Sequence, residues 1–212
     1  MKQFEGKLIV TDLDGTYLFD DHHISRENRE AVAYFMENGG LFTVATGRSK
    51  AGMEHFFPEL SINAPAILYN GSVIYDFNGK ADVWNTCVGE PGFNLCKMLE
   101  RQFPQIGIEV YANHTPYVAQ DNFWTRRHFQ NVKMPWNFCL AEDIPQPWLS
   151  LVVTGESDVL PLVAAFLEEQ FPTQFFIQFS SPHMLEIMHP EANKGIAARH
   201  LWELLEIRPE NV

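Results

Sequence analysis

Short apolar runs alternate with amphipathic stretches over the first third of the chain. Three of these runs have strand character, and they span residues Leu8 to Thr11, Leu41 to Ala45 and Ala66 to Tyr69. Ser25 suits the N-cap of an amphipathic helix that ends near Glu37. Strands that alternate with helices predict a parallel sheet with right-handed crossovers.

The pattern changes after Val73, where strand pairs mix with helices. Asn78-Gly79 lies between two short β-type runs and predicts a hairpin. Beyond it the pattern predicts helices at 93–103 and 159–170, and strands at 106–111, 117–119, 149–154, 175–179 and 184–188. A long amphipathic helix follows at 193–205.

These patterns predict an α/β fold in which one domain interrupts another. A Rossmann-like parallel sheet would be formed by residues 1–77 and 186–212, and residues 78–185 would form an inserted α+β domain. In such sheets ligands bind at the carboxyl ends of the strands. The residues that follow each predicted strand are therefore the first candidates for a site.

Two carboxylates follow the first apolar run, in the segment Asp12-Leu13-Asp14-Gly15-Thr16. Side chains two residues apart on a strand point the same way, so Asp12 and Asp14 would project together. A hard divalent cation such as Mg²⁺ takes oxygen ligands and offsets the repulsion between them. The structural alternative is an ordinary Asp-Gly turn at the end of a strand.

Composition narrows the function classes. Hydrophobic residues make up 46% of the chain and charged residues 20%, enough for an ordinary core. The formal net charge of -12 opposes general binding to nucleic acid or to an anionic membrane, so an anionic substrate needs a local site. The three cysteines form no CxxC pair, and no signal peptide or membrane-length run is present. We expect a cytoplasmic protein; the oligomeric state is not indicated.

Three further polar segments lie at predicted strand ends or at a helix start: Thr46-Gly47-Arg48, Asn70-Gly71 and Asn193-Lys194-Gly195. Each has a structural alternative. The first two segments are compatible with simple turns, Arg48 with a tie between helix and strand ends, and Lys194 with a solvated helix residue.

Taken in order, the four segments resemble the haloacid dehalogenase-like (HAD) phosphatases, specifically the Cof-type branch with a large α/β (type C2) cap. The resemblance covers nearly the whole chain. It implies that Asp12 is the nucleophile that forms an aspartyl-phosphate and that Asp14 is the general acid and base. It also implies a Mg²⁺ ion held by Asp12 and by a backbone carbonyl of Asp14.

The remaining implied site residues bind phosphate or select the substrate. Phosphate would be bound by Thr46, Gly47, Asn70 and Lys194. Candidate specificity residues are Arg48 and the polar or aromatic cap residues His114, Tyr117, Asp121, Trp124 and Arg126. For each of these cap residues, cap core or surface is an equal alternative. All eight histidines are predicted to be surface or packing residues.

The chain departs from the family pattern in two places. Tyr17 stands where the family has an aliphatic residue, which should alter packing only. A fourth motif, whose carboxylates complete the metal site, would follow the next strand, but the sequence ends at Val212; Asp20, Asp21 and Glu186 do not replace it. The expectation is therefore a fragment of a longer phosphatase, with Leu8 to Val10 at an exposed sheet edge.

The predicted function is a Mg²⁺-dependent phosphomonoester hydrolase that acts on a small, sugar-phosphate-like metabolite through an aspartyl-phosphate. Two alternatives remain open. One is a phosphosugar mutase of the same superfamily, which transfers the phosphoryl group to a sugar rather than to water. The other is a truncated, non-catalytic remnant that binds phosphate through Thr46 and Lys194.

Overall fold

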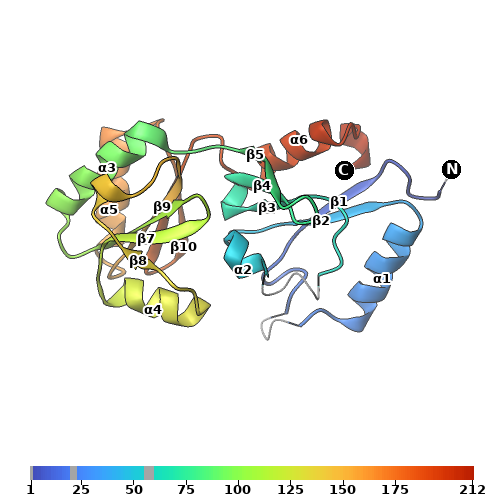
Figure 1. The fold of residues 1–212 in the computed structure, drawn as a ribbon, viewed down its shortest axis with the longest axis horizontal. Coiled ribbons are helices and arrows are strands. Elements are labelled where there is room, and N and C mark those ends of the chain that lie inside the picture. The colour runs from blue at the N-terminus through green and yellow to red at the C-terminus, as the bar shows by residue number, and fades with distance from the viewer. Residues whose placement is uncertain (1, 20–22, 55–59) are drawn as a thin grey trace. The chain divides into compact units, whose positions relative to one another are not determined.

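The chain forms two compact units, one of which is inserted into the other. In the computed structural model, which describes residues 2–19, 23–54 and 60–212, unit 1 comprises Met1–Asn85 and Ala192–Val212. Unit 2 comprises Thr86–Glu191. Asp20 and Asp21 lie outside the described residues. Figure 1 shows the ends of unit 1 in blue and red, with unit 2 in green to orange.

Unit 1 is built on a mixed sheet with the strand order β1-β2-β3-β4-β5. The strands are β1 (Leu8–Asp12), β2 (Leu41–Ala45), β3 (Ala66–Leu68), β4 (Val73–Asp76) and β5 (Ala81–Asn85). The first three are parallel, as the alternating pattern predicts, whereas β4 and β5 extend the same sheet in antiparallel fashion.

The β4–β5 hairpin forms as expected but belongs to a different unit from the one anticipated. Pairing of β5 with β4 places the second hairpin strand in unit 1. The boundaries therefore fall after Asn85 and after Glu191, rather than after residues 77 and 185. A turn signal between two strands shows that they pair, but not which sheet receives them.

Helices cover both faces of this sheet (Figure 1). They are α1 (Arg26–Glu37), α2 (Lys50–Glu54) and α6 (Lys194–Leu204), with 3-10 turns at Tyr69–Gly71 and Pro209–Asn211. The N-cap of α1 is Ser25 as predicted, and its side chain accepts a hydrogen bond from the Asn28 N–H at 3.1 Å. Leu201 of α6 packs against Leu8 and Ile67 of the sheet in a buried apolar cluster.

Strand β1 lies at one end of the sheet order, so the expectation of an edge position for this strand is met. Ile9 in this strand is 43% exposed. Within the described parts of the chain, only β2 pairs with β1.

Unit 2 is a sheet with the strand order β10-β11-β9-β6-β7-β8, packed with helices. Its elements are α3 (Gly89–Gln102), β6 (Gly107–Ala112), β7 (Thr115–Gln120), α4 (Phe123–Val132), β8 (Asn137–Phe138), a 3-10 turn (Ala141–Asp143), β9 (Trp148–Thr154), α5 (Leu160–Gln170), β10 (Phe176–Ser181) and β11 (Met184–Met188). Neighbouring strands are antiparallel except β7 and β8.

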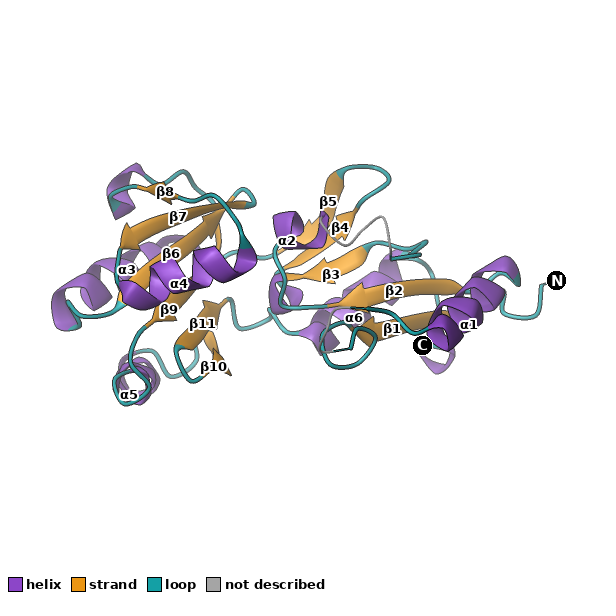
Figure 2. Ribbon diagram, turned by 90° about the horizontal axis from the view of Figure 1, so that it is seen from below, coloured by secondary structure: helices purple, strands orange, loops and turns teal. Residues whose placement is uncertain are grey.

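The two faces of this sheet differ in character. Helices α3 and α5 bury one apolar face, which includes Ile108, Val110 and Leu151. Because side chains alternate along a strand, Glu109 lies on the opposite face. Helix α4 lies on that face, in front of the sheet in Figure 2, while α3 lies behind it.

In the described part of the chain, no helix is long and apolar enough to cross a membrane.

Candidate active site

A lysine and an aspartate far apart in sequence meet at the end of β1. Lys194 Nζ donates to Asp12 Oδ1 at 2.7 Å, although the two residues are 182 positions apart. Asp12 is the last residue of β1 and Lys194 is the first residue of α6. Asn193 caps α6 by accepting a hydrogen bond from the Ile196 N–H at 2.8 Å. This cap fixes the start of α6 at Lys194.

Close backbone approach by a glycine holds this helix start against the sheet. Gly71 has a φ of +107°, in the region that side chains disfavour. A Cβ atom there would lie 2.4 Å from the Asn193 carbonyl carbon and 2.5 Å from its oxygen. Glycine at position 71 therefore lets the residue before Lys194 come within reach of the strand ends.

Thr46 follows β2 and is tied in place by its backbone. Its N–H donates to the Ile67 carbonyl at 2.9 Å, and its own carbonyl accepts from the Asn70 N–H at 3.1 Å. Its Oγ accepts a hydrogen bond from the Arg48 N–H at 3.2 Å. That bond uses a lone pair of the oxygen and not the hydroxyl proton. Because Asp12 is in register with Ala45, Thr46 lies next to the end of β1.

Gly47 and Asn70 pack against one another beside Thr46. A Cβ atom at Gly47 would lie 2.9 Å from Asn70 Oδ1. Asn70 is buried and has a left-handed backbone with φ of 53°. The three predicted phosphate-site positions after β2 and β3 are thus brought together, and Lys194 joins the same sheet edge through Asp12.

Asp14 is held by Arg48 rather than left open. Arg48 Nε donates to Asp14 Oδ2 at 2.9 Å, and Nη2 donates to Oδ1 at 2.6 Å. The loop that carries Asp14 is anchored by Leu13, which is buried and whose carbonyl accepts the N–H groups of Tyr17 and Leu18. Arg48 therefore ties the loops after β1 and β2, which agrees with its structural alternative.

The carboxylates of Asp12 and Asp14 suit a magnesium ion. Both are about half exposed, at 44% and 47%, so solvent reaches both carboxylates. Mg²⁺ typically binds one or two protein carboxylates and keeps several waters, so two carboxylates are a sufficient protein contribution. A cluster of three or more His, Cys, Asp or Glu side chains able to hold a metal does not occur among residues 2–19, 23–54 and 60–212.

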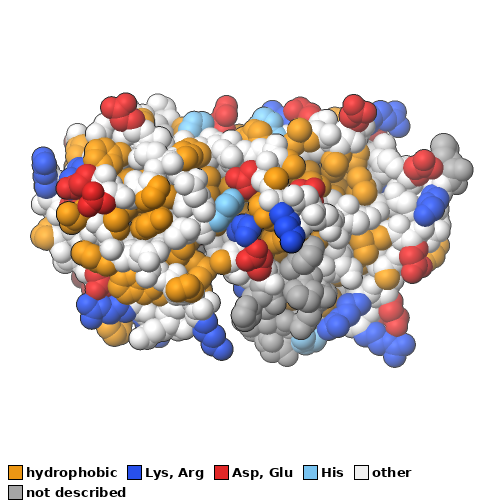
Figure 3. Space-filling model, in the orientation of Figure 1, with side chains coloured by type: hydrophobic (Ala, Val, Ile, Leu, Met, Phe, Trp, Pro, Cys, Tyr) orange, Lys and Arg blue, Asp and Glu red, His pale blue; other side chains and the backbone are white. Residues whose placement is uncertain are grey.

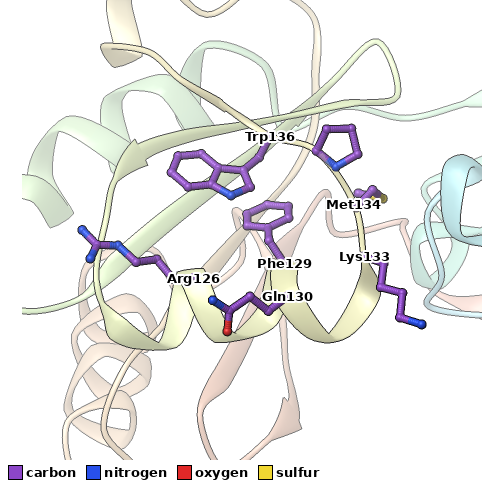
Figure 4. Close-up of a pocket in the computed structure, with 7 residues that line it drawn as sticks. Arg126, Phe129, Gln130, Lys133, Met134 and Trp136 are labelled. Atoms are coloured by element: carbon purple, nitrogen blue, oxygen red, sulfur yellow. The ribbon is translucent and has the colours of Figure 1, made fainter.

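The expected cap specificity residues do not converge on one point. Arg126 lines a concavity of about 600 Å³ beside the stacked rings of Phe129 and Trp136 (Figure 4), and its guanidinium is paired with Asp121. Trp124 lines a different, smaller concavity. His114 lies in the tight turn between β6 and β7 with a φ of 63°, and Tyr117 is in β7.

One buried pair in unit 2 was missed from the sequence. His128 Nδ1 lies 2.9 Å from Glu109 Oε2, and Glu109 is fully buried. A single glutamate inside a run of apolar residues is the only sequence signal of such a pair. His128 is therefore neither a surface nor a simple packing residue.

Charges of both signs are interspersed on the face seen in Figure 3. With a formal net charge of -12, the cationic partner for an anionic substrate has to be local. Lys194 at Asp12 provides such a cation in unit 1.

Comparisons with known proteins show the family of this chain. The sequence profile of the haloacid dehalogenase-like hydrolase family matches residues 9–212. The chain is 29% identical over 210 residues to 5-amino-6-(5-phospho-D-ribitylamino)uracil phosphatase YcsE of Bacillus subtilis, a match that covers 97% of this chain and 74% of that protein.

Solved structures share the fold at low sequence identity. A haloacid dehalogenase-like hydrolase from Bacteroides thetaiotaomicron has a TM-score of 0.84 at 23% identity, covering 97% of this chain and 79% of that one. The HAD subclass IIB sugar phosphatase BT4131 has a TM-score of 0.80 at 16% identity, covering 97% and 78%. The family match over residues 9–212 confirms the resemblance drawn from the four motifs: the chain belongs to the haloacid dehalogenase-like hydrolase family.

Proposed function

We propose that this chain is a Mg²⁺-dependent phosphomonoester hydrolase that acts on a small phosphorylated metabolite through an aspartyl-phosphate. The observation that carries the proposal is the 2.7 Å contact between Lys194 Nζ and Asp12 Oδ1, at the sheet edge where Thr46 also lies. A carboxylate nucleophile, a fixed cation and a hydroxyl donor together suit a transferring phosphoryl group.

In the proposed reaction, Asp12 attacks phosphorus with a carboxylate oxygen, and the bond from phosphorus to the leaving alcohol breaks. Asp14 donates its proton to that alcohol oxygen, and later accepts a proton from the water that hydrolyses the aspartyl-phosphate. The Thr46 hydroxyl donates a hydrogen bond to a phosphate oxygen. Lys194 orients Asp12 and balances the negative charge of the phosphoryl group.

The Arg48–Asp14 pair places a condition on this reaction. Both carboxylate oxygens of Asp14 accept charge-assisted hydrogen bonds from the Arg48 guanidinium. To act as an acid, Asp14 has to release at least one oxygen from Arg48 and take up a proton. The guanidinium nitrogen released by that oxygen would then contact the phosphate or the leaving group, which would reconcile the structural contact of Arg48 with a role in specificity.

The Asp12 carboxylate and the backbone carbonyl of Asp14 would hold the metal ion. When bound, Mg²⁺ would screen the charge between the Asp12 carboxylate and the substrate phosphate and favour in-line attack. The exposure of both residues supports this assignment, since Asp12 is the last residue of β1 and Asp14 lies two positions beyond it.

The substrate class is proposed from the relatives. One acts, by its name, on a phosphorylated ribityl compound, and another is described as a sugar phosphatase. We infer a small phosphorylated sugar or sugar alcohol for this chain, with the inserted unit 2 selecting the leaving group.

Steady-state hydrolysis of p-nitrophenyl phosphate tests the proposal. Activity should require Mg²⁺, disappear in excess EDTA and fall by about 10³-fold or more in Asp12→Asn. Asp158→Asn, an exposed aspartate in unit 2, is the matched control and should retain full activity. Undiminished activity in Asp12→Asn would contradict the assignment. Phosphoryl transfer to added hexose in place of water would indicate a mutase instead.

A further inference from the structure

A small pocket in unit 2 lies between helix α4 and the turn that joins β10 to β11. Trp124, Arg127, His128 and Asn131 line one wall, spaced as one face of the helix. The β10–β11 hairpin contributes Ser181, His183 and Met184 to the other wall. The volume is about 190 Å³. At roughly 30 Å³ for each water in the liquid, this space suits a small polar molecule.

His128 is held in the pocket wall by a carboxylate behind it. Its Nδ1 lies 3.0 and 2.9 Å from the two carboxylate oxygens of Glu109. Tyr111 Oη also approaches Glu109 Oε2, at 3.5 Å. Because Nδ1 is used by Glu109, the opposite ring nitrogen Nε2 is the atom that His128 can offer to a ligand.

The surroundings of His128 favour its charged form. Burial by itself lowers the pKa of His128, but the hydrogen bond and charge of Glu109, with the charge of Glu186, outweigh it and raise the pKa above its ordinary value. Burial raises the pKa of Glu109, against the hydrogen bonds from His128 and Tyr111. A protonated His128 presents Nε2–H as a hydrogen-bond donor.

Arg127 supplies a second cation that aromatic contacts hold at the pocket. Its guanidinium lies over the Trp124 ring, 5.4 Å from the centroid. The Trp124 ring also stacks on the His183 ring, with 3.4 Å between the ring centroids. His183 Nδ1 lies 3.0 Å from the Gly155 carbonyl oxygen. Within the described residues, Arg127 has no hydrogen bond or salt bridge, so its N–H groups are open to a ligand.

We propose that this pocket binds a small oxyanion, a carboxylate or a phosphate group, between His128, Arg127 and Asn131. The described lining contains no Asp or Glu side chain, and it provides imidazolium, guanidinium and amide donors. Glu109, Glu186, Tyr111 and His183 are the other titratable groups around His128. The larger concavity of Figure 4 differs, because its Arg126 is already paired with Asp121.

The indole N–H of Trp124 gives a local probe of binding, by ¹H–¹⁵N NMR of the full chain with the signal assigned through Trp124→Phe. Titration with malonate and with sulfate at pH 6 should shift this signal saturably, whereas glycerol should not. Arg127→Gln should weaken binding at least tenfold. Arg101→Gln, at an exposed arginine at the end of α3, is the matched control and should bind as the wild type does.

The histidine adds a second signature. Binding should weaken as the pH rises through the raised pKa of His128. Glu109→Gln, checked for folding by circular dichroism, should lose affinity at pH 7.5. Absence of a saturable shift, or equal titrations of Arg127→Gln and Arg101→Gln, would overturn the proposal and leave only a bulk ionic effect.

The anion could be the non-reacting end of the substrate or a separate ligand, and only the first source rests on the proposed phosphatase function. If it is part of the substrate, Arg127→Gln should raise KM about tenfold for 3-phosphoglycerate but not for p-nitrophenyl phosphate. If it is separate, Arg127→Gln leaves both KM values unchanged, although anions still shift the Trp124 signal of the wild type. Because the NMR titration needs no hydrolysis, it tests the pocket even if the phosphatase proposal fails.

Discussion

Replacing Gly71 with alanine tests how the helix start at Lys194 is positioned. The new Cβ would lie 2.4, 2.5 and 2.9 Å from the carbonyl carbon, oxygen and nitrogen of Asn193. All three are backbone atoms, so no side chain can rotate away and the two segments have to separate. The φ of +107° adds strain of its own, because side chains disfavour that region.

The two effects give the expected magnitude. Unfavourable backbone conformation costs about 1–3 kcal/mol, and overpacking costs about 1–3 kcal/mol. Their sum, roughly 2–6 kcal/mol, corresponds to a fall in Tm of at least about 4 °C for a chain of this size. Lys194 follows Asn193 directly, so separation should also lengthen its 2.7 Å contact with Asp12. A misplacement of about 1 Å can reduce catalysis by about 10²-fold.

Calorimetry and p-nitrophenyl phosphate hydrolysis would measure both effects. Gly6→Ala is the matched control, because Gly6 has a φ of +76° but no atom within 4 Å of its Cβ position. It should show backbone strain alone, about 1–2 kcal/mol, with normal activity. If Gly71→Ala has the same Tm as Gly6→Ala and keeps full activity, the close approach of Gly71 to Asn193 does not position Lys194.

Three further predictions address other parts of the molecule. Lys194→Met should lower kcat/KM for p-nitrophenyl phosphate by about 10²-fold or more while leaving Tm nearly unchanged, since the exposed ion pair contributes little stability; full activity would exclude its role. Leu201→Ala should cost about 2–5 kcal/mol in urea unfolding, because Leu201 is fully buried against the sheet; a cost under about 1 kcal/mol would contradict that packing. The raised pKa of His128 contributes stability that is fully present below about pH 6.5 and is lost as the pH rises through the folded-state pKa. Wild-type unfolding free energy should therefore fall from pH 6 to 8.5, and Glu109→Gln should lack that fall; parallel profiles would show that Glu109 does not control His128.

Local patterns were sufficient to predict much of the fold. The apolar run and N-cap signals placed β2 at Leu41–Ala45 and α1 after Ser25, as observed. Helix α4 was not anticipated, because its buried positions include Thr125 as well as Phe129 and so give no clear apolar stripe. A helix whose inward face is partly polar is recognised only when its partners are known.

Some contacts of the site were also expected from the sequence, and others were not. The resemblance to the phosphatase family implied that Asp12 and Lys194 belong to one site, and the structure brings them to 2.7 Å. The clamp between Arg48 and Asp14 and the pairing of Glu109 with His128 depend on side chains from separate elements. Neither pairing follows from residue spacing, because tertiary contacts decide both.

Direct detection of a phosphorylated Asp12 would test the central claim. The chain should be mixed with Mg²⁺ and ³²P-labelled acetyl phosphate, quenched in acid within a turnover, and digested for peptide mapping. We predict label on the peptide that contains Asp12, its loss on a chase with unlabelled buffer, and no label in Asp12→Asn. Turnover without label on Asp12, or label on another residue, would contradict the account.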